Sequence, residues 1–176
     1  MSIHLTFHGA EGTVTGSCIH LQTENTQILI DCGLQQENDS LSKQSEFQFD
    51  VSEIDAVILT HGHLDHSGRV PFLVNTGFQG VIYGHYATCE IAKVIWNDCS
   101  RIHSESEQLY DESFVTAACR KCMPIGYNVP MQIKDLCFTL RDAGHILGSS
   151  SCAGGNKKKK DSFLRRCWSC KYTDHS

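Results

Sequence analysis

Short apolar runs bounded by turn residues recur along the chain and predict alternating strands and helices. Six runs have the length of strands: residues 3–8, 18–23, 27–31, 56–59, 80–83 and 136–140. The loop Gly9–Gly16 separates the first two runs, and the turn at 23–26 joins the second and third. The runs at 56–59 and 80–83 are continuously apolar, which is typical of strands buried on both faces of a sheet. The pattern therefore predicts an α/β fold.

Apolar residues at helical spacing predict the helices between these strands. The longest helix is expected from Thr88, a candidate N-cap, to about Ser104, because Ile91, Val94, Ile95, Cys99 and Ile102 recur at that spacing. Shorter helices are expected at 69–76, with Pro71 in the first turn, and at 113–122. The polar span Gln35–Asp50 predicts a surface loop with a short helical turn.

The composition indicates one globular domain outside membranes. The 176 residues are 40% hydrophobic and 20% charged, which is ordinary for a single domain with its own core. No apolar run reaches membrane-spanning length, and residues 1–5 lack the features of a signal peptide, so we expect a cytoplasmic protein. The net charge of −5 disfavours a protein that coats nucleic acid, but metal ions can hold a phosphate without a basic surface.

Ten cysteines do not indicate a disulfide framework here, because several of them lie in apolar strands and no secretion signal precedes them. Reduced, buried thiols are expected. The two CxxC pairs, Cys119/Cys122 and Cys167/Cys170, lie much further apart than the pairs of a zinc ribbon, and the first falls in a predicted helix. A structural zinc site at these pairs is therefore not expected.

A cluster of histidines and one aspartate directly follows the predicted strand 56–59. His61, His63, Asp65 and His66 stand within six positions in a glycine-containing segment, where open α/β sheets place their chemistry. Imidazole and carboxylate ligands suit zinc, and a catalytic zinc site needs three protein ligands and an open position. A further histidine, His145, follows the predicted strand 136–140 and completes such a set.

The remaining histidines have no partner motif, so solvated or packed side chains are expected: His4, His8, His20, His85 and His103.

The HxHxDH motif and the downstream His145 resemble the metallo-β-lactamase superfamily. The amino-acid sequences of further segments are similar to those of its RNA-processing β-CASP branch: Phe7–Ala10, Val14–Ser17, Ile28–Gly33, His66–Pro71 and Asp142–Ser149. This resemblance extends from residue 3 to about residue 150. It implies an αββα sandwich, of which residues 1–150 supply the incomplete N-terminal half.

The resemblance also implies residue roles and a substrate. His61, His63 and His145 would hold one zinc, and Asp65 and His66 a second. A hydroxide between two zinc ions would attack an RNA phosphodiester, with Asp65 and His66 as catalytic residues and Asp65 orienting the water or accepting its proton. Asp31 and Asp142 are expected beside the ligands, where they would orient them.

The chain departs from the family after Ser150. The bridging aspartate of a Ser-Gly-Asp segment, a later histidine and the β-CASP domain are not recognisable, so we expect one zinc rather than two and weak or absent turnover. Residues 151–176 show no strand alternation and predict a disordered basic tail. An exposed sheet edge is expected to promote self-association.

One hypothesis for this tail is a frameshift. Codons can be chosen so that residues 151–176, read one nucleotide later, give VVQVEIKKKKILFSGDVGLANTPIT, which contains the missing Ser-Gly-Asp. The single codon of Trp168 forces glycine in that frame.

Three functions remain open from the sequence: a zinc-dependent ribonuclease of the β-CASP type, a superfamily hydrolase acting on a thioester or lactam, and a non-catalytic zinc-binding remnant.

Overall fold

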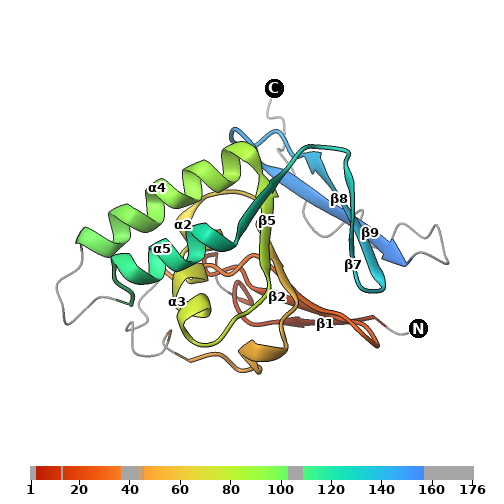
Figure 1. The fold of residues 1–176 in the computed structure, drawn as a ribbon, viewed down its shortest axis with the longest axis horizontal. Coiled ribbons are helices and arrows are strands. Elements are labelled where there is room, and N and C mark those ends of the chain that lie inside the picture. Colours follow the sequence, from red (N-terminus) through yellow and green to blue (C-terminus); the bar gives the residue numbers. More distant parts are fainter. Residues whose placement is uncertain (1–2, 13, 37–43, 45, 103–108, 157–176) are drawn as a thin grey trace.

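The structure is a computed structural model that describes residues 3–12, 14–36, 44, 46–102 and 109–156. Within these ranges it shows one layer of helices and two stacked sheets (Figure 1). No helix among the described residues is long and apolar enough to cross a lipid bilayer.

Sheet A has six strands in sequence order: β1 (His4–Phe7), β2 (Ile19–Gln22), β3 (Gln27–Ile30), β4 (Ala56–Ile58), β5 (Val81–His85) and β6 (Cys122–Ile125). The β1–β2 and β2–β3 pairs are antiparallel, and the pairs from β3 to β6 are parallel. The carboxyl ends of the parallel strands lie at one edge, so the segments that follow β3 and β4 meet there. Five of these strands were predicted from the apolar runs in the sequence, whereas β6 was not.

Sheet B is an antiparallel sheet of three strands: β7 (Pro130–Ile133), β8 (Leu136–Asp142) and β9 (Ser150–Asn156). Its inner face packs against sheet A through an apolar layer that includes Ile28, Ile58, Phe138 and Leu140. Alternation along β8 explains this packing, because its buried residues occupy every second position from Leu136 to Leu140.

The helices cover the other face of sheet A (Figure 1). They are α2 (Leu64–Ser67), α3 (Val70–Asn75), α4 (Tyr86–Ile102) and α5 (Glu112–Lys121), with a 3-10 helix η1 at Val51–Glu53. Their core contains Trp96 and Phe78, both completely buried. The described residues thus form the αββ part of the expected αββα sandwich.

The assignment of Thr88 as an N-cap is wrong. Helix α4 begins two residues earlier, directly after β5, and the His85 ring nitrogen Nδ1 accepts from the Ala87 N–H at 3.3 Å. The Thr88 side chain is completely buried inside the first turn and bonds another segment.

The expectation that no strand follows Ser150 is wrong for residues 151–156. Strand β9 pairs with β8 along its whole length, from Asp142↔Ser150 to Leu136↔Asn156. Backbone pairing with a preformed strand compensates for the weak strand propensity of Gly154 and Gly155. The rest of the predicted tail, residues 157–176, lies outside the described residues, as does Cys167/Cys170.

Seven cysteines of the described residues are free thiols, as expected: Cys18, Cys32, Cys89, Cys99, Cys119, Cys122 and Cys137. Cys18 and Cys32 are buried, whereas Cys119 and Cys122, at the junction of α5 and β6, are partly buried.

Candidate metal centre

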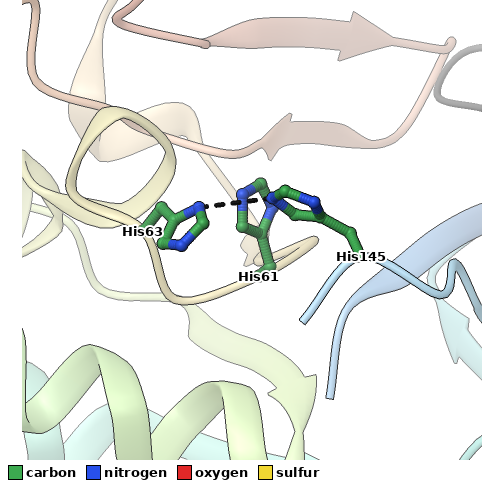
Figure 2. A group of neighbouring side chains, drawn as sticks. All are labelled: His61, His63 and His145. Carbon is green, nitrogen blue, oxygen red and sulfur yellow. Dashed lines mark hydrogen bonds between the residues drawn. The ribbon is translucent and has the colours of Figure 1, made fainter. Parts of the chain in front are cut away.

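The predicted ligands come from two segments that sheet topology brings together. His61 and His63 follow the carboxyl end of β4, and Asp65 and His66 lie on the short helix α2 rather than in a loop. His145 lies in the connection between β8 and β9, and Figure 2 shows its ring facing those of His61 and His63. A cavity of about 110 Å³ opens among these side chains.

Three imidazoles have the geometry of a metal-binding group. One ring nitrogen each from His61, His63 and His145 lies within 4.8 Å of the others, and Nε2 of His145 is 3.4 Å from Nδ1 of His63. His61 is buried, His63 is partly buried and His145 is exposed, so the group is open on one side. Three imidazole nitrogens with an open position fit a catalytic zinc ion.

A buried carboxylate orients two of the histidines. Oδ2 of Asp31 accepts from the Thr60 hydroxyl at 2.8 Å and lies 2.7 Å from Nδ1 of His66. Because the Thr60 hydroxyl hydrogen points to Asp31, its oxygen is free to accept from Nδ1 of His61 at 3.0 Å. Both rings therefore carry their proton on Nδ1 and leave Nε2 available for a metal.

The backbone at Asp31 and Gly33 fits this arrangement. Asp31 has a φ of 63°, a left-handed conformation that a non-glycine residue seldom adopts, and its N–H bonds the Ile58 carbonyl at 3.0 Å. A Cβ at Gly33 would lie 1.6 Å from the Asp65 carbonyl oxygen, so only glycine permits the segment after β3 to pass this close to α2.

Electrostatics divide the histidines into two kinds. Burial, reinforced by the neighbouring histidines, lowers the pKa of His61 to about 3, and burial also lowers the pKa of His63. Burial acts to lower the pKa of His66 too, but its hydrogen bond to Asp31 and the charges of Asp31 and Asp65 outweigh it and raise the pKa. His61 and His63 are therefore neutral and ready to bind a metal at pH 7, whereas His66 retains a proton more readily.

Asp65 lies beside this group. Its Oδ2 is 3.5 Å from Nε2 of His66, and it lines the same cavity as the three histidines. Asp65 and His66 offer one carboxylate and one imidazole, which is fewer than the three protein ligands of a catalytic zinc site.

The turn that carries His145 is held by its own hydrogen bonds. Asp142 does not contact the histidines in its described bonds; its Oδ1 accepts from the Gly144 N–H at 2.9 Å and shapes the turn. The Ser149 hydroxyl oxygen accepts from the His145 N–H at 3.0 Å and from the Ile146 N–H at 3.2 Å. The Ser150 N–H bonds the Thr60 carbonyl at 2.7 Å, which fixes this turn against the end of β4.

Side chains outside the motifs complete the support, and sequence reasoning did not identify them. The Thr88 hydroxyl donates to the Gly148 carbonyl at 2.7 Å, and the Tyr127 hydroxyl donates to the Ser149 carbonyl at 2.9 Å. His85 stacks on Tyr127, with ring centroids 4.1 Å apart. Thr60 adjoins His61 and could have been suspected, but no sequence signal links Thr88 or Tyr127 to residues 143–149.

Comparisons with known proteins identify the family of the chain. The family model described as the metallo-beta-lactamase superfamily matches residues 12–115. Transcription termination factor FttA of Methanocaldococcus jannaschii is 33% identical over 153 residues, which cover 84% of this chain and 24% of that protein. Ribonuclease TTHA0252 of Thermus thermophilus is 33% identical over 142 residues, which cover 81% of this chain and 32% of that protein. The chain thus spans about a quarter to a third of the length of these relatives.

Solved structures share the fold at lower identity. The metallo-beta-lactamase fold protein YhfI of Bacillus subtilis has a TM-score of 0.58 at 18% identity, covering 88% of this chain and 59% of that one. BJP-1 of Bradyrhizobium japonicum, a subclass B3 metallo-beta-lactamase, also has a TM-score of 0.58 at 18% identity, covering 89% of this chain and 56% of that one.

Proposed function

Because the chain belongs to the metallo-β-lactamase superfamily, we propose that it is part of a zinc-dependent ribonuclease of the β-CASP type, acting on RNA phosphodiesters in the cytoplasm. The observation that carries this proposal is the group formed by His61, His63 and His145, whose ring nitrogens lie within 4.8 Å of one another. RNA as the substrate class is supported by relatives that are named a ribonuclease and a transcription termination factor.

The residues of the site have distinct proposed roles. Zinc, when bound, acts as a Lewis acid and lowers the pKa of a coordinated water toward neutrality. His61, His63 and His145 would hold it, Asp65 would orient the water and accept its proton, and His66 would assist as a further ligand or proton carrier. Asp31 would keep His61 and His66 in the tautomers that carry the proton on Nδ1.

One zinc rather than two is proposed for this chain. A second zinc would have only Asp65 and His66 as ligands. Because the pKa of His66 is raised while its Nδ1–H bonds Asp31, a proton competes with the metal at Nε2. Turnover by this chain is therefore expected to be weak. A non-catalytic zinc-binding remnant is the second candidate, favoured by this small ligand set.

The test is cleavage of labelled single-stranded RNA by the chain with and without added zinc, alongside hydrolysis of a thioester and a lactam. We expect zinc-dependent RNA cleavage that His145→Ala and Asp65→Asn abolish, while His4→Ala, a change at an exposed histidine on β1, leaves it intact. Zinc binding without turnover would identify the remnant, and thioester or lactam hydrolysis another hydrolase. Failure of the wild-type chain to bind zinc would contradict all three.

Self-association through the edge of sheet B is a further part of the proposal. Among the described residues β9 pairs with β8 alone, so its other edge offers backbone groups to a second copy. Sedimentation over a range of protein concentrations tests this: a concentration-dependent dimer is expected, and a monomer at all concentrations would contradict it.

The frameshift is likewise a proposal. The shifted frame would replace residues 151–156 of β9 by Val-Val-Gln-Val-Glu-Ile, a run with far higher strand propensity than Ser-Cys-Ala-Gly-Gly-Asn. Sequencing the genomic DNA from the codon of Leu147 onward decides it, since an open frame encoding Ser-Gly-Asp is expected one nucleotide over.

A further inference from the structure

We propose that a second cavity, beside Arg69 and separate from the metal centre, binds a phosphate-sized anion. This cavity, the Arg69 cavity, has a volume of about 210 Å³, and its walls include His8, Gly16, Gln35, Phe47, Phe49 and Arg69. None of its lining residues lines the cavity at the histidine group.

The Arg69 side chain carries a buried positive charge with little compensation. It is 9% exposed, one terminal nitrogen donates to the Glu46 carbonyl at 2.8 Å, and the guanidinium lies 4.3 Å from the centre of the Phe47 ring. Its buried Nε has no hydrogen-bond partner among the described residues. None of the ion pairs among the described residues includes Arg69. A guanidinium stays protonated in proteins, so the buried charge of Arg69 has no acidic partner among the described residues.

His8 adds two buried ring nitrogens to the same cavity. Neither makes a well-formed hydrogen bond to a described residue, although the Gln48 side chain interacts with the ring. The ring packs against Phe49 with centroids 4.9 Å apart. Burial lowers the pKa of His8, the Gln48 side chain partly opposes this, and the Arg69 charge lowers it further. The imidazole is therefore neutral at pH 7 and has one N–H to donate.

An oxyanion satisfies both groups at once. A guanidinium presents donors in a planar fork that matches phosphate oxygens, and an imidazole N–H can donate to another oxygen. The cavity also has room for several water-sized groups. Glu46 is the one carboxylate residue among the lining residues, and its side chain is exposed, so it does not neutralise the buried guanidinium.

The position of the Arg69 cavity relates it to the proposed substrate. Its wall residue Gly16 precedes Ser17, whose N–H bonds the Asp65 carbonyl at 2.8 Å, so one short segment separates the cavity from α2. The anion could be free phosphate or a backbone phosphate of RNA. If the anion is a backbone phosphate of RNA, this inference rests on the proposed function; binding of free phosphate does not.

The test uses the full chain stripped of metal by a chelator, so that phosphate has no zinc to bind. Inorganic phosphate is titrated by calorimetry, and we expect saturable binding that Arg69→Gln and His8→Phe each weaken on the order of tenfold or more, the loss of one charge-assisted or buried hydrogen bond. Lys134→Gln serves as the control, because Lys134 is an exposed cation paired with Asp55 in another part of the molecule. It should leave the affinity unchanged.

Thermal unfolding shows whether each variant is folded. If Arg69→Gln unfolds, His8→Phe decides, since phenylalanine keeps the ring packing against Phe49. Absence of saturable binding to the wild-type chain, or equal affinity in the wild type and the folded variants, would overturn the proposal.

A short single-stranded RNA then distinguishes the two sources of phosphate. If phosphate displaces the RNA, and Arg69→Gln binds the RNA more weakly than the wild-type chain does, a backbone phosphate occupies the Arg69 cavity. RNA affinity that is unchanged by Arg69→Gln, together with weakened phosphate binding, indicates a free anion. Hydrolysis is not measured, so failure of the proposed ribonuclease activity leaves this result intact.

Discussion

Thr88 and Gly148 are sixty residues apart in the sequence, yet the Thr88 hydroxyl donates to the Gly148 carbonyl at 2.7 Å in a buried environment. This bond joins the first turn of α4 to the turn that carries His145. Gly148 has a φ of 82°, and a Cβ there would lie 2.7 Å from the Thr88 backbone nitrogen, so the two segments are in close contact.

Replacing Thr88 by valine should weaken both the fold and the metal site. Valine has nearly the same shape but removes the shorter of the two hydrogen bonds to the Gly148 carbonyl, leaving the Ser150 hydroxyl at 3.1 Å as its remaining donor. This loss costs about 0.5–1.5 kcal/mol of unfolding free energy. Because His145 lies on the same turn, zinc affinity should fall as well. Urea denaturation and zinc titration measure the two effects.

Thr116→Val is the matched control, since the Thr116 hydroxyl donates to the Glu112 carbonyl at 2.9 Å on the exposed surface of α5. Its effect should stay within about 0.5 kcal/mol. Equal stability and zinc affinity of the two variants would show that the Thr88 bond does not support the turn.

Asp31→Asn should lower the pKa of His66 and destabilise the metal-free protein. The carboxylate accepts from the Thr60 N–H and hydroxyl and pairs with His66, and an asparagine loses the charge and part of this accepting capacity. Breaking one partner of a buried pair costs about 3 kcal/mol. Histidine NMR titration and urea denaturation measure these changes.

Asp50→Asn is its control, because Asp50 is an exposed cap of η1 that asparagine replaces well. A His66 pKa that is the same in Asp31→Asn and in the wild type would argue against the described pair.

Acid should destabilise the metal-free protein through His61. Its pKa is about 3 in the folded state and near its ordinary value of 6.5 in the unfolded state, so below pH 6.5 the unfolded chain binds one more proton. Unfolding free energy should therefore fall as pH decreases from 6.5 toward 3, by up to about 1.4 kcal/mol per pH unit from this one group.

Chemical denaturation at pH 7, 6 and 5 checks this expectation. His61→Gln, which removes the titrating group, should show a smaller slope between pH 6.5 and pH 5. Identical slopes would mean that His61 titrates normally in the folded protein.

Zinc should stabilise the folded chain by mass action, by about 2.7 kcal/mol when free zinc is a hundred times the dissociation constant. Chelation should remove this gain completely. His145→Ala should abolish the zinc effect while changing metal-free stability little, because His145 is exposed. His4→Ala, also at an exposed position, should retain the full stabilisation by zinc. If His4→Ala lost this stabilisation, zinc would bind outside the group of His61, His63 and His145.

The sequence by itself determined the alternation of strands and helices and the identity of the three grouped histidines. A short, continuous apolar run such as 56–59 is typical of a buried strand. Closely spaced histidines directly after a strand indicate a metal-binding group. These signals are local, so they can be detected without knowing the fold.

Only the tertiary structure decided what depends on distant partners. The segment Ser150–Asn156 has no local strand signal, and its pairing with β8 makes it β9. The sequence suggests Thr88 as a helix N-cap, but its hydroxyl donates instead to the Gly148 carbonyl. In each case the deciding hydrogen bond links groups whose proximity depends on how the backbone folds, which residue type alone does not encode.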